Sequence, residues 1–146
     1  MTTLTEATLI HRSSKLGEVP YGPGDVIRFP QGLPGFERLR EFLLVTREEC
    51  QPFVLLASLE DPEVTLPLVP LVPGTLGLAA PAEALGCLGR AGDDALGYYA
   101  VVSIGLEARE IIANLRAPVV VNLDTRLGCQ VILPDETLPL AARLPL

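Results

Sequence analysis

Proline and glycine interrupt this chain so often that long regular helices have little room to form. Fourteen prolines and thirteen glycines are spread through 146 residues, and they separate short apolar runs. Proline removes a backbone donor and glycine permits left-handed turns, so both residues typically mark the corners between strands. The pattern predicts an all-β protein, and its many short strands favour a small closed or nearly closed β-barrel-like domain.

The strand candidates are short runs with apolar or β-branched character. Within residues 64–72, Pro67 and Pro70 withhold ladder donors, which predicts an edge strand. The pairs Pro23-Gly24, Pro34-Gly35 and Pro73-Gly74 predict type II turns, because proline fixes φ at the second position and glycine supplies a positive φ at the third. The complete set of candidates is residues 7–10, 19–21, 25–29, 41–46, 52–59, 64–72, 96–104, 111–115, 118–123 and 129–133.

One or two short helices complete the predicted fold. Phe36, Leu39 and Phe42 or Leu43 have helical spacing, and residues 81–88 begin with proline and are followed by glycine. The second segment is too short to be stable alone. The chain contains no internal repeat and no linker, so we expect residues 1–146 to form a single domain.

Charge and hydropathy narrow the classes of function. The net charge is −7, whereas nucleic-acid binders usually present a basic face to phosphates. We therefore expect basic protein partners and no direct nucleic-acid contact, unless the charge serves solubility alone. No apolar run approaches the roughly 20 residues that cross a bilayer, and the first residues lack the basic start and apolar core of a signal peptide. The expected location is the cytoplasm, without membrane contact.

Motifs for catalysis and cofactor binding are missing from the sequence. No GxGxxG, Walker A or GxSxG pattern occurs. The cysteines are widely spaced, and the single histidine, His11, lies near an N-terminus expected to fray. Neighbouring carboxylates on a strand point to opposite faces, so adjacency creates no acid–base pair. We predict no enzymatic activity, metal or cofactor. The alternatives are a small-ligand-binding barrel and a hydrolase built on acidic residues.

Three segments together resemble the flagellar assembly factor FliW family. They are FPQGLPGFE (29–37), preceded by LGEVPYGPGDVIR (16–28); PFVLLASLEDP (52–62); and IIANLRAPVVVNLDTRLGCQVIL (111–133). The third is the most specific, because it is a long ordered pattern. The resemblance covers residues 16–133, whereas the C-terminal LPLAARLPL departs from the family pattern.

The resemblance implies a non-enzymatic β-barrel-like protein that binds flagellin in the cytoplasm. It also implies binding to the RNA-binding regulator CsrA, which stops CsrA from repressing translation of messages such as that of flagellin. Free flagellin would capture the protein, and export of flagellin would release it to CsrA. The divergent C-terminus leaves open a variant that acts as a flagellin-only chaperone.

Candidate partner-binding residues lie in the connections between predicted strands. Gln31, Phe36 and Glu37 belong to a proline- and glycine-rich loop that is expected to be rigid, and preorganised loops lose little entropy on binding. The same loop can also be read as a structural corner with inward phenylalanines. Glu60 and Asp61 are either turn residues before Pro62 or acidic contacts for CsrA.

Asn114, Arg126 and Gln130 are polar residues that interrupt apolar strands near the C-terminal end of the chain. They are expected either to bond backbone groups at strand ends or, for Arg126 and Gln130, to line the partner surface.

Overall fold

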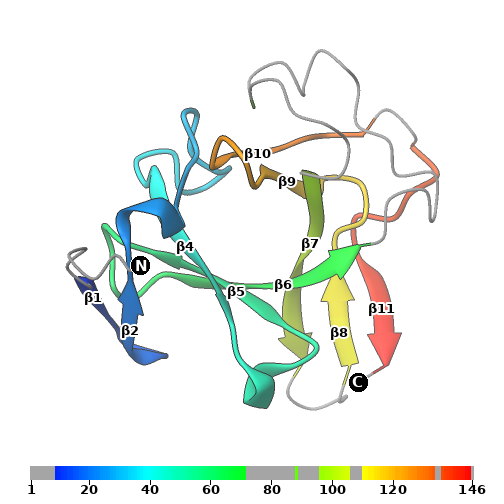
Figure 1. Ribbon diagram of the computed structural model, residues 1–146. Helices are drawn as coiled ribbons and strands as arrows, with labels where there is room; N and C mark the ends of the chain where they lie inside the picture. Colours follow the sequence, from blue (N-terminus) through cyan, green and yellow to red (C-terminus); the bar gives the residue numbers. More distant parts are fainter. Residues whose placement is uncertain (1–8, 72–87, 89–95, 106–109, 134–135, 146) are drawn as a thin grey trace.

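A ring of seven strands forms the body of the protein in the computed structural model, which describes residues 9–71, 88, 96–105, 110–133 and 136–145. The ring closes because β9 pairs with both β10 and β7 (Figure 1). This confirms the predicted closed all-β barrel. The ring strands are β3 (Val26–Arg28), β4 (Glu41–Thr46), β5 (Val54–Ser58), β6 (Thr65–Leu71), β7 (Leu96–Gly105), β9 (Val119–Asn122) and β10 (Leu127–Gln130).

Two smaller pieces lie outside the ring. β8 (Glu110–Ala113) pairs with β7, and β11 (Ala142–Pro145) pairs with β8. The hairpin of β1 (Leu9–Ser13) and β2 (Gly17–Tyr21) forms a separate two-stranded sheet. Figure 1 shows this hairpin in blue and β11 in red on opposite sides of the ring.

Apolar side chains cover both faces of the ring wall. Phe42 of β4 is fully buried in the interior with Phe29, whose ring meets it edge-on at a centroid distance of 5.3 Å. Its neighbours Leu43 and Val45 belong to a second cluster with Val19 of β2, so the hairpin covers the outside of the ring there. Alternation along β4 therefore buries both faces. The interior cluster is Ile27, Phe29, Leu33, Phe42, Leu56, Leu68, Val119 and Val121.

The N-terminal hairpin is held in place by more than this packing. The Arg47 guanidinium donates to the carbonyl of Leu16 at 3.1 Å, and the backbone N–H of Ser14 donates to the carbonyl of Pro62 at 2.9 Å. His11 is buried in β1 with 8% of its surface exposed. His11 therefore lies in a hairpin that contacts with Arg47 and Pro62 hold, while residues 1–8, where fraying was expected, lie outside the described residues.

At the ends of four strands, a short polar side chain in the last strand residue or the one after it bonds the turning backbone. In each case the side-chain oxygen accepts the N–H groups two and three residues ahead, at distances of 2.9 to 3.3 Å. This arrangement satisfies backbone donors that leave the ladder and starts the turn. The four residues are Ser13, Ser58, Asn114 and Asn122.

The prediction that residues 64–72 form an edge strand is wrong, because β6 lies between β5 and β7. β6 pairs with β5 through Thr65–Leu68 and with β7 through Leu68–Leu71, so each half has one partner. Pro67 lies in the first half and Pro70 in the second. The missing N–H of each proline can therefore face the side where that half has no neighbour.

Two other local predictions also fail. Pro23-Gly24 begins a 3₁₀-helix, η1 (Pro23–Asp25), instead of a type II turn. The segment from Phe36 to Leu43 contains no helix: it is a loop followed by β4, because Phe42 and Leu43 alternate across the ring wall. A second 3₁₀-helix, η2 (Glu48–Cys50), follows β4. The predicted helix over 81–88 lies outside the described residues except for Leu88, and Pro73-Gly74 lies outside them entirely.

Candidate functional site

The loop between β3 and β4, residues 29–40, is tightly bonded to itself. The N–H of Phe36 donates to the carbonyl of Leu33 at 2.7 Å, and Gly35 has φ of 87°. These values confirm the type II turn predicted at Pro34-Gly35. One turn earlier, Gly32 has φ of 67° and donates its N–H to the carbonyl of Phe29 at 2.8 Å. The loop is therefore preorganised, with Phe29 and Leu33 in the core.

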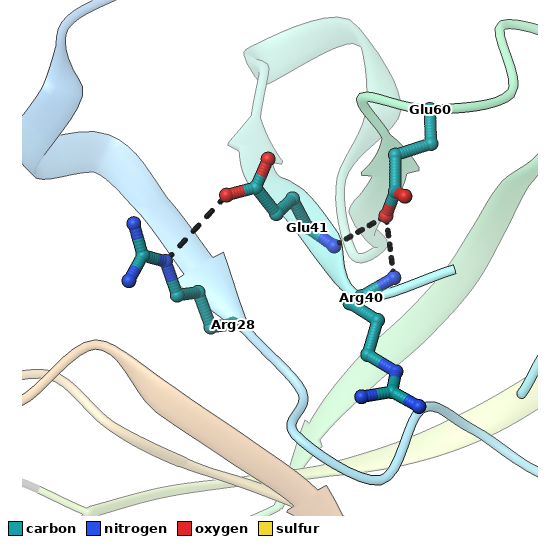
Figure 2. A network of polar contacts seen from close by, with 4 residues as sticks. All are labelled: Arg28, Arg40, Glu41 and Glu60. Carbon is teal, nitrogen blue, oxygen red and sulfur yellow. Dashed lines mark hydrogen bonds and ion pairs between the residues drawn. The ribbon is translucent and has the colours of Figure 1, made fainter. Parts of the chain in front are cut away.

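Glu60 ties this loop to the β5–β6 connection. Figure 2 shows its carboxylate reaching the backbone at the start of β4, where Oε1 accepts the N–H groups of Arg40 at 2.5 Å and Glu41 at 2.9 Å. The Glu41 carboxylate in turn lies 3.5 Å from Nε of Arg28. Glu60 thus acts on the backbone of a segment about 20 residues away in sequence.

The two glutamates of this region stay ionised more readily than free glutamate. The N–H groups of Arg40 and then Glu41 lower the pKa of Glu60, and the N–H of Gly35, which donates to Oε2 of Glu37 at 3.0 Å, lowers the pKa of Glu37. Hydrogen bonds to a carboxylate favour its charged form. Both side chains are exposed and therefore present negative charge at the surface.

Replacing Glu60 by glutamine should reduce the pH dependence of stability while leaving the loop tethered, because the amide oxygen can accept the same bonds. The folded-state pKa is lowered, so the extra stability is complete above the ordinary pKa of glutamate and is lost as the pH falls through the lowered value. Near neutrality, we expect the free energy of unfolding of wild type to exceed that of Glu60→Gln by about 1 kcal/mol or less, since solvent screens exposed charges.

Urea unfolding over a series from about pH 7 to about pH 2 measures this difference, which should vanish in acid. Glu49→Gln is the matched control, because Glu49 is an exposed glutamate in η2, away from the loop that Glu60 holds. A gap between wild type and Glu60→Gln that persists unchanged in acid contradicts the assigned role of the carboxylate.

A groove of about 470 Å³ lies between this loop and the β5–β6 connection. We call it the acidic groove. Its apolar lining comes from the half-buried Phe36, Leu39 and Val64. Its charged lining consists of Glu37, Glu60, Asp61 and one cation, Arg38.

A smaller hollow of about 170 Å³ lies on the other side of Glu37. It brings together Gln31, Glu37 and Gln130, with the half-buried Cys129 beside them. Because Glu37 lines both hollows, six of the eight residues proposed from the sequence surround one continuous region. These six are Gln31, Phe36, Glu37, Glu60, Asp61 and Gln130.

Asn114 and Arg126 are not in this region. Asn114 accepts the N–H groups of Arg116 and Ala117, which is the strand-end role described above. The Arg126 guanidinium donates to the carbonyl of Gly24 at 2.7 Å and lies 3.9 Å from Asp25. Both residues make the backbone hydrogen bonds that the structural interpretation predicted, and their role in partner binding stays a prediction. Gln130 also has a structural contact, since its amide donates to the carbonyl of Ala117 at 2.8 Å.

Sequence reasoning missed Leu39, Val64 and Arg38 as lining residues of the acidic groove. Leu39 was assigned to a helix and Val64 to an edge strand, so neither suggested a surface. Arg38 lies beside Glu37 in a charged run that carries no distinctive spacing. Antiparallel pairing of β4 with β5 and the tether from Glu60 bring these segments together.

Within the described part of the chain, no three His, Cys, Asp or Glu side chains are grouped as metal ligands would be. Among the same residues no helix has the length and apolarity to span a bilayer. What the site provides is a rigid, mostly polar surface with exposed carboxylates around a small apolar patch.

These features define a class of small closed β-barrel proteins with a preorganised surface loop. A crystal structure of the flagellar assembly factor FliW has this architecture: it superposes with a TM-score of 0.82 at 27% identity, over 96% of this chain and 98% of that one. The model of the FliW protein family matches residues 11–144. The chain therefore belongs to the FliW family of flagellar assembly factors.

Named relatives support this assignment. The flagellar assembly factor FliW of Thermotoga neapolitana is 40% identical over 126 residues, which is 84% of this chain and 85% of that protein. The FliW of Clostridium tetani is 34% identical over 82% and 84% of the two chains. That of Carboxydothermus hydrogenoformans is 33% identical over 92% and 88%.

Proposed function

We propose that this flagellar assembly factor acts by binding, without catalysis, and that its partners are cytoplasmic flagellin and CsrA. Binding to CsrA would antagonise the RNA binding of CsrA and relieve repression of flagellin translation. Flagellin would compete by sequestering the protein until export. The protein itself would contact neither RNA nor a membrane, and it would need no cofactor.

The observation that carries the proposal is the distribution of negative charge. The chain has a net charge of −7, and three carboxylates gather at the acidic groove. An RNA-binding protein must present cationic surface to phosphate. An acidic partner is attracted to such a surface and disfavours phosphate beside it. The relatives are named for flagellar assembly, which supports flagellin as the other partner.

Calorimetric titration of the purified protein with CsrA from the same organism should show binding that weakens as salt is raised, because exposed charges are screened. Flagellin added beforehand should abolish the CsrA signal. The titration is performed at about 50 mM and about 200 mM salt, a range over which electrostatic association changes strongly.

Each result of the titration has a definite meaning. Flagellin binding without CsrA binding would leave a flagellin-only chaperone and remove the translational role. Binding to neither partner by a folded sample would contradict the proposed function. Binding to both partners at once would contradict the competition between them.

A further inference from the structure

The proposed function does not say which surface of the barrel meets CsrA. The acidic groove is distinguished by the combination of three carboxylates with an apolar floor. Counting its single cation, Arg38, against Glu37, Glu60 and Asp61 gives −3 + 1 = −2 for the groove lining. A groove of this kind complements a chain segment that carries lysine or arginine beside an apolar side chain.

The carboxylates of the groove differ in what they already bond. Oε1 of Glu60 accepts two backbone N–H groups, which commits that oxygen to holding the loop. Oε2 of Glu37 accepts the N–H of Gly35, and Oδ1 of Asp61 accepts the N–H of Glu63 at 3.0 Å, so each of these contacts joins residues two positions apart. These contacts are local, whereas the bonds of Glu60 reach residues 19 and 20 positions away and hold the loop. Glu37 and Asp61 are therefore the carboxylates that can engage a partner's cation without disturbing the long-range tether of the loop.

Resting on the proposed function, we infer that the acidic groove docks a cationic segment of CsrA. Glu37 and Asp61 contact its lysine or arginine side chains, and its apolar side chain covers Phe36 and Val64. Glu60 is a positioning residue, because its bonds to Arg40 and Glu41 fix the wall of the groove. Because the loop is already held by its own backbone hydrogen bonds, little of its backbone has to become ordered when a partner docks.

The test removes the two contact charges while keeping their hydrogen-bond acceptors. In Glu37→Gln/Asp61→Asn, the amide oxygens can still accept from Gly35 and Glu63. The control, Glu48→Gln/Glu49→Gln, removes two exposed carboxylates from η2, beyond the other end of β4. A six-residue strand spans about 20 Å, so the control charges lie about two Debye lengths away at moderate salt. Both variants raise the net charge by two.

Titration with CsrA should give about fivefold weaker binding for the groove variant at low salt, as expected for two exposed charge pairs. The affinity of the groove variant should also change less with salt than that of wild type. The control should match wild type in affinity and in salt dependence. Glu60→Gln, which keeps the loop tethered, should lose less affinity than Glu60→Ala, which releases it. Thermal unfolding of every variant verifies that the fold is intact.

The outcomes separate this inference from the proposed function. If wild type binds CsrA and the groove and control variants bind equally, the groove is not the docking surface, although the function stands. If the groove variant loses affinity for flagellin alone, the assigned occupant is wrong. If wild type itself fails to bind CsrA, the proposed function and the inference both fall. Equal losses for Glu60→Gln and Glu60→Ala would make Glu60 a contact, contrary to its positioning role.

Discussion

Gly32→Ala is expected to lower the free energy of unfolding by about 3 kcal/mol, which is large for the addition of one methyl group. Gly32 has φ of 67°, so an alanine there carries left-handed strain. A Cβ on Gly32 would also lie 2.6 Å from the carbonyl oxygen of Glu37 and 2.7 Å from its Cα. These are backbone atoms of the same bonded loop, which has little freedom to move away.

Gly35→Ala is the matched control for this experiment. Gly35 also has a positive φ, of 87°, but a Cβ there would meet no atom within 4 Å. Gly35→Ala should therefore lower the free energy of unfolding only through conformational strain, by about 1 kcal/mol. Urea unfolding of both variants separates strain from steric overlap. Equal losses of stability in the two variants would show that the close approach of Glu37 is not limiting.

Asn122→Ala should cost a similar amount, about 3 kcal/mol, because the side chain is fully buried at the end of β9. Its Oδ1 accepts the N–H groups of Asp124 and Thr125, and its Nδ2 donates to the carbonyl of Leu88 at 2.9 Å. Alanine leaves the N–H groups of Asp124 and Thr125 without their acceptor. It also removes one donor to the Leu88 carbonyl, which the Thr125 hydroxyl still bonds. A buried group that loses its partner bears its full desolvation cost.

Asn114→Ala provides the comparison, since Asn114 makes the same two backbone contacts at a half-buried strand end. Water can replace its oxygen more easily, so we expect a loss of about 1 kcal/mol. Urea unfolding of the two alanine variants measures the difference. A loss at Asn114 as large as that at Asn122 would contradict burial as the source of the effect.

The sequence predicted the architecture well because the barrel depends on local signals. Short apolar runs separated by proline and glycine are enough to indicate a closed sheet, and the Pro34-Gly35 turn follows from the chemistry of two residues. The errors arose where partners distant in sequence decide the outcome. Pro67 and Pro70 suggested an edge, but β6 changes partner between them. β11 was missed because its segment, LPLAARLPL, contains prolines and gains its strand form by pairing with β8.

The candidate site was predicted in part for the same reason. The rigid loop carrying Gln31, Phe36 and Glu37 could be recognised from its turn residues, and Glu60 and Asp61 from their position in a charged turn. These groups lie together because β4 pairs with β5 and Glu60 bonds Arg40 and Glu41, and the spacing of residues in the sequence did not predict these contacts. Assignment of these residues to a partner stays a prediction.

Closure of the ring also has a consequence for synthesis of the protein. β3 to β7 follow one another along the chain and pair as neighbours, so they can assemble as they leave the ribosome. The ring is completed only by β9 and β10, within residues 119–130, which join β7 on one side and β3 on the other. Until β9 and β10 are in place, the apolar inner face of the sheet is not enclosed, and β3 and β7 lack these partners. The nascent chain must therefore extend past residue 130 before its core is enclosed, and pairing across such sequence distances is intrinsically slow.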